Sequence, residues 1–196
     1  MKKYISIMLS LVILTSVFCF SGCGSTNDVV ENLEGEYTTD LSGTELNVFN
    51  WGEYISDGSE GMLDINAAFE KLTGIKVNYS NYESNETMYS KLKSGATSYD
   101  IIIPSDYMIQ RLIREDMLTG IDTSKLTNYK YIAQQYKNLY FDPDNKYSVP
   151  YNVGMVGLIY NTQTVKETPK SWAIMWDEQY KDQILSFNNS RDAFAI

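Results

Sequence analysis

The chain has 196 residues, of which 43% are hydrophobic, and it carries a net charge of −9. This length and composition are typical of a globular protein with one good core or two small ones. The acidity, with an isoelectric point near 4.5, argues against a nucleic-acid partner, which needs a basic surface. It is compatible with a cationic partner.

The first 22 residues have the pattern of a bacterial export signal. Lys2 and Lys3 give a positively charged start, and the run from Ile5 to Phe18 is apolar apart from four hydroxyl residues. The run is too short for a comfortable membrane span, so residues 1–22 are predicted to be a signal peptide that is removed.

The segment Phe20-Ser21-Gly22-Cys23 resembles the bacterial lipoprotein box, in which the cysteine is acylated and becomes the first mature residue. Phe20 stands where leucine is usual, and the alternative is an ordinary secretory signal with an incidental cysteine. Residues 23–44 contain five acidic residues and no Lys or Arg, which predicts a flexible tether. We therefore expect an extracytoplasmic protein that a lipid on Cys23 anchors to the bacterial cell membrane, without spanning it.

From residue 45 onward strand and helix patterns alternate, and 45–149 is predicted to be a first α/β lobe. The expected strands are at 46–49, 75–79 and 101–103, and the expected helices at 65–72, 88–92 and 108–113. Gly74 and the pair Ser94-Gly95 stand where C-terminal helix stops belong. The βαβαβα order implies parallel strands with right-handed crossovers, and a doubly wound sheet places the first strand between the second and third.

Residues 150–196 are predicted to be a crossing segment and the start of a second lobe. An extended stretch broken by Pro150 leads into an apolar run at 153–160, which is expected to form a strand. The further expected elements are an amphipathic helix at 172–180, a strand at 184–187 and a helix capped by Ser190. A second lobe of this size is too small to close a core, so the chain is expected to be the front part of a longer two-lobed protein.

Aromatic and acidic residues follow two of the expected strands. Asn50-Trp51-Gly52-Glu53-Tyr54 comes after the first strand, and Pro104-Ser105-Asp106-Tyr107 after the third. The carboxyl ends of neighbouring parallel strands lie together at the edge where open α/β sheets bind ligands. Because rings and carboxylates both attract positive charge, this edge is predicted to bind a cation.

Several residue types and motifs that often carry catalysis are missing. The chain contains no histidine, Cys19 lies in the segment to be removed, and Cys23 is the predicted lipid site. A histidine for acid–base relay and a thiol nucleophile in the mature domain are therefore absent, as is a glycine-rich phosphate loop. No pair of acids is convincingly positioned for glycosidase chemistry. We expect a protein that is not an enzyme and that uses no cofactor or metal.

Six segments carry a resemblance to a known family. They are NWGEY at 50–54, TGIKV at 73–77, YESNETMY at 82–89, YDIIIPSDY at 99–107, SVPY at 148–151 and NSRDAF at 189–194. In order and spacing they resemble the spermidine/putrescine-binding proteins that serve polyamine ABC importers, and the resemblance extends from Leu46 to the end. It implies two α/β lobes joined by crossing strands, as in type II periplasmic binding proteins. It also implies that the lobes close over a linear polyamine. The protein is expected to be a monomer that delivers this ligand to an ABC permease.

The resemblance further implies which residues contact the ligand. Trp51 and Tyr54 correspond to aromatic positions whose rings flank the methylenes and ammonium groups, and Glu53 corresponds to a carboxylate near one end of the ligand. The other implied contacts are Ser105 and Tyr107 after the third strand, and Asp192, which corresponds to an acid that pairs with a ligand nitrogen.

Several of these residues also suit purely structural roles. Ser105 is a suitable helix N-cap, and Asp192 a suitable acid for the first turn of a helix. The turn at 82–86 is interpreted as a cap of the second helix and not as a binding loop. Gly52 and Asn189 stand where some family members have threonine and aspartate, so the preference between spermidine and putrescine stays open.

Three other functions remain open at this point. A binding protein of the same fold for a sugar or another solute would show little dependence on ligand charge. A surface sensor or adhesion lipoprotein would expose an apolar patch and ignore small molecules. A fragment that lacks half of its site would bind nothing.

Overall fold

The computed structural model describes residues 38–194, which fall into two compact units. The first unit ends at Ile103 and the second begins at Pro104. The expected signal peptide at 1–22, the predicted lipid site Cys23 and most of the tether at 23–44 lie outside the described residues. Within the described part, no helix has the length and apolar character needed to cross a membrane.

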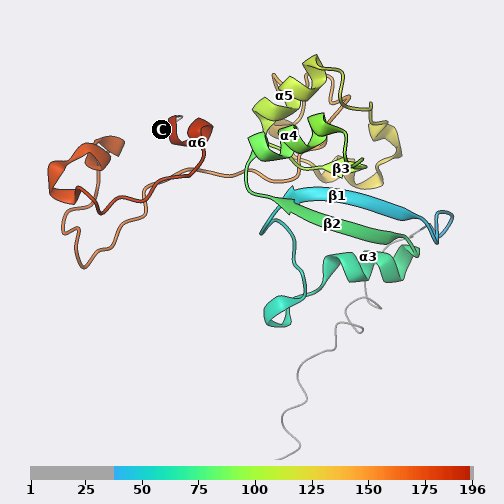
Figure 1. Ribbon diagram of the computed structural model, residues 1–196, viewed down its shortest axis with the longest axis horizontal. Helices are drawn as coiled ribbons and strands as arrows, with labels where there is room; N and C mark the ends of the chain where they lie inside the picture. Colours follow the sequence, from blue (N-terminus) through green and yellow to red (C-terminus); the bar gives the residue numbers. More distant parts are fainter. Residues whose placement is uncertain (1–37, 195–196) are drawn as a thin grey trace, which may run out of the picture. The chain divides into compact units, whose positions relative to one another are not determined.

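The first unit is built on a parallel three-stranded sheet (Figure 1). Its strands are β1 (Glu45–Trp51), β2 (Lys76–Tyr82) and β3 (Ile101–Ile102), in the order β2-β1-β3. The predicted parallel arrangement, with the first strand in the middle, is therefore confirmed. Trp51 pairs with Tyr82, and Phe49 pairs with Ile102, so the carboxyl ends of the strands share one edge.

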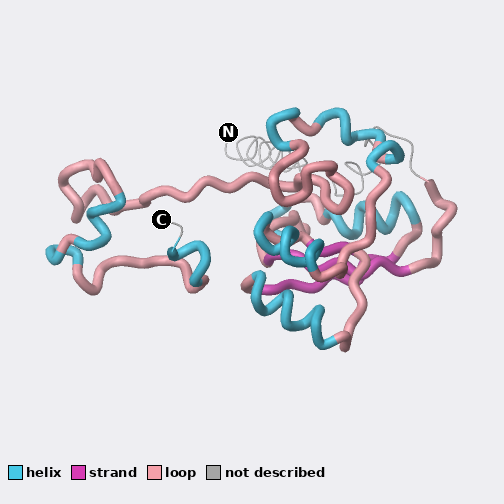
Figure 2. Tube along the Cα trace, turned by 90° about the horizontal axis from the view of Figure 1, so that it is seen from above, coloured by secondary structure: helices cyan, strands magenta, loops and turns pink. Residues whose placement is uncertain are grey.

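Two helices cover this sheet, one on each face (Figures 1 and 2). They are α3 (Ile65–Thr73) and α4 (Asn85–Ser94), and the short 3₁₀ helix η2 (Ser59–Gly61) precedes them. Gly74 and Gly95 end them with φ of 73° and 65°, the left-handed region that glycine enters at little cost. The two predicted helix stops are thus confirmed.

The N-terminus of α4 is held by a capping box. The Ser84 hydroxyl accepts the Thr87 backbone N–H at 3.1 Å, and the Thr87 side chain accepts the Ser84 N–H at 3.2 Å. These bonds satisfy backbone donors that an uncapped helix leaves free. The interpretation of the turn at 82–86 as a helix cap is confirmed.

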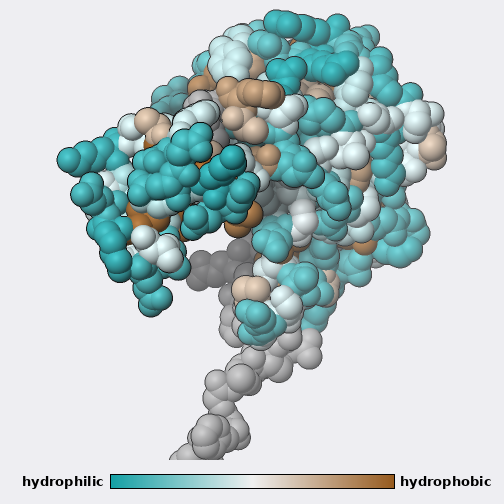
Figure 3. All heavy atoms as spheres, turned by 60° about the vertical axis from the view of Figure 1, so that its left-hand side comes forward, coloured by the Kyte–Doolittle hydropathy of each residue, from teal (hydrophilic) through white to brown (hydrophobic). Residues whose placement is uncertain are grey.

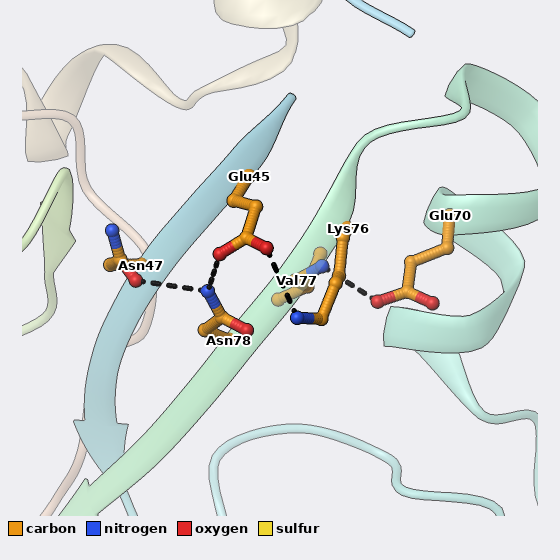
Figure 4. A network of polar contacts seen from close by, with 6 residues as sticks. All are labelled: Glu45, Asn47, Glu70, Lys76, Val77 and Asn78. Carbon is orange, nitrogen blue, oxygen red and sulfur yellow. Dashed lines mark hydrogen bonds and ion pairs between the residues drawn. The ribbon is translucent and has the colours of Figure 1, made fainter. Parts of the chain in front are cut away.

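Polar side chains fix the register of β1 and β2 at the start of the two strands (Figure 4). The Glu45 carboxylate accepts from Asn78 Nδ2 at 2.7 Å and from Lys76 Nζ at 3.1 Å. On the side of α3, Glu70 accepts the backbone N–H of Val77 at 2.6 Å and so ties that helix to β2. The predicted ligand-binding edge lies at the other end of these strands, where their carboxyl ends meet.

The second unit begins with the helix α5 (Asp106–Arg114), whose Met108 and Leu112 are fully buried. Five 3₁₀ helices follow, namely η3 (Thr123–Lys125), η4 (Thr127–Tyr131), η5 (Gln134–Tyr136), η6 (Trp172–Trp176) and η7 (Glu178–Tyr180). The short helix α6 (Ser190–Phe194) is the last described element.

A buried carboxylate organises the turn at 142–148 in the second unit. Asp142 is only 3% exposed. Its oxygens accept the backbone N–H groups of Lys146, Tyr147 and Ser148 at 3.1, 3.0 and 2.8 Å, and the Ser148 hydroxyl at 2.7 Å. A buried carboxylate is tolerated when hydrogen bonds replace its water shell. Asp142 therefore sets the path of the chain just before the Ser148–Tyr151 segment.

Four expectations for the second unit are wrong. No strand forms at 153–160 or at 184–187, because no described segment pairs with either run, and a strand exists only through such pairing. The expected helix at 172–180 is divided into η6 and η7, because the Asp177 side chain accepts the Gln179 N–H and starts a new turn. The cap of α6 is Asn189, not Ser190, since Asn189 Oδ1 accepts the Arg191 N–H at 3.0 Å.

The lobe boundaries predicted at 45–149 and 150–196 stay predictions. The face of the molecule in Figure 3 is mainly hydrophilic, and its hydrophobic side chains form small separate groups. Isolated exposed apolar residues are common on folded proteins and carry no functional meaning by themselves.

Candidate ligand-binding site

A hollow of about 450 Å³ lies at the carboxyl ends of β1 and β2, entirely within the first unit. Its lining combines the loop after β1 with the end of β2, and consists of Trp51, Gly52, Glu53, Tyr54, Asn81, Tyr82 and Glu83. The predicted loop after the first strand lines this hollow, but the second side comes from β2 and not from the segment 104–107 after the third strand.

Three aromatic rings form a row along the hollow. The Trp51 ring lies in the middle, with its centroid 4.7 Å from that of Tyr82 and 6.0 Å from that of Tyr54. Tyr82 is 5% exposed, whereas Tyr54 is 41% exposed. The row thus runs from a buried ring to a surface ring, and the predicted residues Trp51 and Tyr54 belong to it together.

Two asparagine side chains hold the backbone of Trp51. Asn50 is 2% exposed, and its Oδ1 accepts the Trp51 N–H at 2.7 Å. From the neighbouring strand, Asn81 Nδ2 donates to the Trp51 carbonyl at 3.0 Å. Because the N–H and the carbonyl of Trp51 are both hydrogen-bonded, its backbone is fixed at the edge of the hollow.

Behind the hollow the aromatic packing continues into the core. Phe49 meets Tyr82 edge to face at 4.9 Å and stacks on Tyr99 at 4.4 Å, and the ammonium of Lys91 lies 4.7 Å from the Phe49 centroid. Burial is the largest single influence on the pKa of the Tyr99 hydroxyl and raises it. Hydrogen bonds from Lys91 and Ser80, together with the Lys91 charge, lower this pKa by more, so its net shift is downward. This part of the chain already holds one ammonium group against aromatic faces.

Tyr82 connects this packing to the third strand. Its hydroxyl donates to the Ile103 carbonyl at 2.5 Å, and its ring lies between those of Phe49 and Trp51. One side chain therefore ties together the ends of all three strands.

Two carboxylates stand at the hollow, Glu53 and Glu83. Both residues are exposed, and neither has an ion-pair partner within the described part of the chain. No Lys or Arg belongs to the described lining. The negative charge at the hollow is therefore not neutralised from within the site, which favours a positively charged ligand.

The second unit carries the other three predicted residues. Ser105 is half-buried at the N-cap position of α5, but its side chain makes no capping hydrogen bond to that helix, so the capping role considered for it is wrong. Instead the Asp106 carboxylate accepts the Tyr107 N–H at 2.6 Å and the Tyr140 hydroxyl at 3.0 Å. The hydrogen bond to Asp106 raises the pKa of the Tyr140 hydroxyl. Asp106 thus has a structural role at this helix start.

Arg191, the neighbour of Asp192 in the chain, contacts the ring of Tyr107. The Arg191 guanidinium lies 4.7 Å from the centroid of the Tyr107 ring, and Asp192 follows it in the first turn of α6. Tyr107 is half-buried and Asp192 is exposed. The second unit therefore brings a cation of α6 against an aromatic ring of α5, and within the described residues no hydrogen bond or ion pair places the Asp192 carboxylate there.

Sequence reasoning missed three residues of the hollow: Asn81, Tyr82 and Glu83. The turn that contains two of them was assigned only to helix capping. The signal that identifies them is the register of the sheet, because Tyr82 at the end of β2 pairs with Trp51 at the end of β1. No cluster of three or more His, Cys, Asp or Glu suited to a metal ion occurs within residues 38–194.

A family model matches the second part of the chain. Residues 96–196 match the model described as bacterial extracellular solute-binding protein. The spermidine/putrescine-binding periplasmic protein of Salmonella typhimurium is 41% identical over 153 residues, which are 77% of this chain and 42% of that protein. The resemblance that the sequence motifs indicated is confirmed.

Two solved structures resemble this chain. A putative spermidine/putrescine ABC transporter from Listeria monocytogenes matches with a TM-score of 0.70 and 40% identity, over 76% of this chain and 45% of that chain. The TpPotD lipoprotein of Treponema pallidum matches with a TM-score of 0.62 and 31% identity, over 69% of this chain and 41% of that chain. The chain spans less than half the length of each of these relatives. Since the family model covers more than half of it, the chain belongs to the bacterial extracellular solute-binding proteins.

Proposed function

We propose that this chain carries part of the ligand site of an extracytoplasmic solute-binding protein that captures a polyamine, spermidine or putrescine, for import by an ABC transporter. The observation that carries the proposal is the composition of the hollow. Three aromatic rings and two carboxylates line it, and no basic side chain does so among the described lining residues. The names of the Salmonella and Listeria relatives, both of which include spermidine and putrescine, support the same ligand class.

The chemistry of a polyamine fits this lining. A polyamine is an apolar stem that carries ammonium groups, so it needs both covering surface and negative charge. Aromatic faces cover methylenes and attract each ammonium group by about 0.5–2 kcal/mol. Carboxylates form charge-assisted hydrogen bonds with the same groups, and closure of the protein over the ligand strengthens both terms by excluding water. The protein acts by binding and not by catalysis.

The residue roles follow from this chemistry. Trp51 and Tyr54 cover the stem, and Glu53 binds an ammonium group. Ser105, Tyr107 and Asp192 of the second unit are proposed as the further contacts, with Asp192 pairing with a ligand nitrogen. Residues 45–149 are proposed as the first lobe, with 150–196 as the crossing segment and the start of the second.

Lipid anchoring through Cys23 is part of the proposal. The relative from Treponema pallidum is described as a lipoprotein, which supports it. The anchored protein is proposed to work as a monomer that docks on its permease. A Cys23→Ser variant should move from the membrane fraction to the soluble fraction, and unchanged membrane association of that variant would contradict the anchor.

Isothermal titration calorimetry of the purified protein tests the ligand class. Spermidine and putrescine should give saturable binding that weakens as salt is added, because charged groups carry the recognition. A neutral sugar should give no heat of binding. Binding of the sugar with no response to either polyamine would contradict the proposal.

A further inference from the structure

Glu83 lines the hollow from the end of β2, where none of the predicted contacts lies. The row runs from Tyr54 through Trp51 to Tyr82, with centroid separations of 6.0 and 4.7 Å. Glu53 directly precedes Tyr54 at one end of the row, and Glu83 directly follows Tyr82 at the other. Both carboxylates line the same hollow. The hollow is therefore bordered by one acidic residue from each of the two strand ends and by three rings.

The sheet explains why the two acids are close enough to serve one ligand. Trp51 and Tyr82 are Cα partners in adjacent parallel strands, which lie about 4.8 Å apart. Glu53 and Glu83 lie in the loops that leave these strands at the same edge. A short flexible cation that contacts one of the loops can therefore reach the other.

The Glu83 side chain is accessible to a ligand and is not engaged by other described residues. It is exposed, and no hydrogen bond or ion pair occupies it within the described part of the chain. The helix cap beside it is made by Ser84 and Thr87 and does not use Glu83. An acid with a structural role here would be expected to pair with a neighbouring donor or cation.

We propose that Glu83 binds a second ammonium group, so that the hollow selects a cation with two charges separated by an apolar stem. This inference rests on the proposed function and adds a specificity-determining residue to it. A diamine can offer one ammonium group to each of the two carboxylates and its apolar stem to the rings. A monoamine with the same stem satisfies one of the two carboxylates and leaves the other without a partner.

Calorimetry with putrescine and n-butylamine, which share a four-carbon stem, tests the inference on the full chain. Glu83→Gln should weaken putrescine binding by about threefold to tenfold, the range expected for a charge-assisted contact at an exposed site. It should change n-butylamine binding by less than about twofold, because Glu53 still holds the single ammonium group. Glu83→Asp keeps the charge and should recover most of the putrescine affinity.

Glu86→Gln is the matched control, because it removes the same charge three residues along, in the first turn of α4 and outside the hollow. It should leave the affinities for both amines unchanged, and thermal melts should show that every variant is folded. Equal putrescine affinity of the wild type and Glu83→Gln would overturn the inference alone. An equal loss for both amines would also overturn it. Absence of putrescine and spermidine binding by the wild type would instead contradict the proposed function.

Discussion

The rings of Trp51 and Tyr82 lie 4.7 Å apart between centroids because the two residues are paired at the ends of β1 and β2. Side chains at paired positions of neighbouring strands point to the same face of a sheet. The aromatic surface of the hollow is therefore a product of strand register. Asn81, which precedes Tyr82 in β2, strengthens this strand pairing by donating a hydrogen bond to the Trp51 carbonyl at 3.0 Å.

Trp51→Ala should weaken polyamine binding by about twofold to thirtyfold, which is the effect of losing one cation–π contact. Calorimetry with spermidine measures it. Trp176→Ala is the control, because Trp176 is 71% exposed, belongs to η6 and is not one of the lining residues of the hollow. Unchanged affinity in Trp51→Ala, with normal affinity in the control, would remove Trp51 from the site.

Tyr82→Phe keeps the ring of the row but removes the hydroxyl that donates to Ile103. The free energy of unfolding should fall by about 0.5–1.5 kcal/mol, the usual net value of one hydrogen bond. Urea denaturation measures the change. Tyr131→Phe removes a hydroxyl from a residue that is 76% exposed and should leave the stability unchanged. A Tyr82→Phe protein as stable as the control would show that this hydrogen bond does not tie the strands together.

Asp142→Asn should loosen the turn at 142–148, because an amide places N–H groups where the backbone needs acceptors. The cost is about 1–3 kcal/mol for buried donors that lose their partner. Hydrogen exchange at the amides of Lys146, Tyr147 and Ser148 reports it directly. The exposed Asp144 in the same turn supplies the control Asp144→Asn. Protection that survives in Asp142→Asn would contradict the organising role of this carboxylate.

Glu45→Gln should make stability less sensitive to acid. The hydrogen bond from Asn78 first, and then the hydrogen bond and charge of Lys76, lower the pKa of Glu45 below its usual 4.5. A lowered carboxyl pKa contributes stability that is present above the unfolded value and is lost as pH falls through the folded value. The urea midpoint of the wild type should therefore exceed that of the variant at neutral pH.

The difference between wild type and Glu45→Gln should shrink as the pH falls from the usual glutamate value of 4.5 through the lowered pKa of folded Glu45. Glu167→Gln, a change at an exposed glutamate outside this network, should follow the wild type over the whole range. A constant difference at every pH would mean that the polar network of β1 and β2 does not depend on the Glu45 charge.

Local signals explain what could be predicted from the sequence. Gly74 and Gly95 end their helices because left-handed backbone is cheap for glycine, and this preference is visible without the fold. The alternation of strands and helices likewise sufficed to predict the middle position of β1. The placement of Trp51 and Tyr54 at one hollow followed from the end of β1 alone.

What could not be predicted depends on partners in space. Glu83 lines the hollow because Trp51 is in register with Tyr82, and no local sequence pattern encodes that register. The run at 184–187 has the composition of a strand, but no described segment pairs with it. Ser105 has the right residue type for a helix cap, yet its side chain does not make the capping bond. In each case the missing information is which segment lies alongside.

A thermal melt of the chain from Gly24 to Ile196, with spermidine, putrescine and a neutral sugar, tests polyamine capture most directly. A ligand that binds only the folded state raises the melting temperature with its concentration. A cooperative melt that rises with both polyamines and ignores the sugar is the predicted result. A cooperative melt that ignores both polyamines would contradict the assignment of this chain as a polyamine-binding protein.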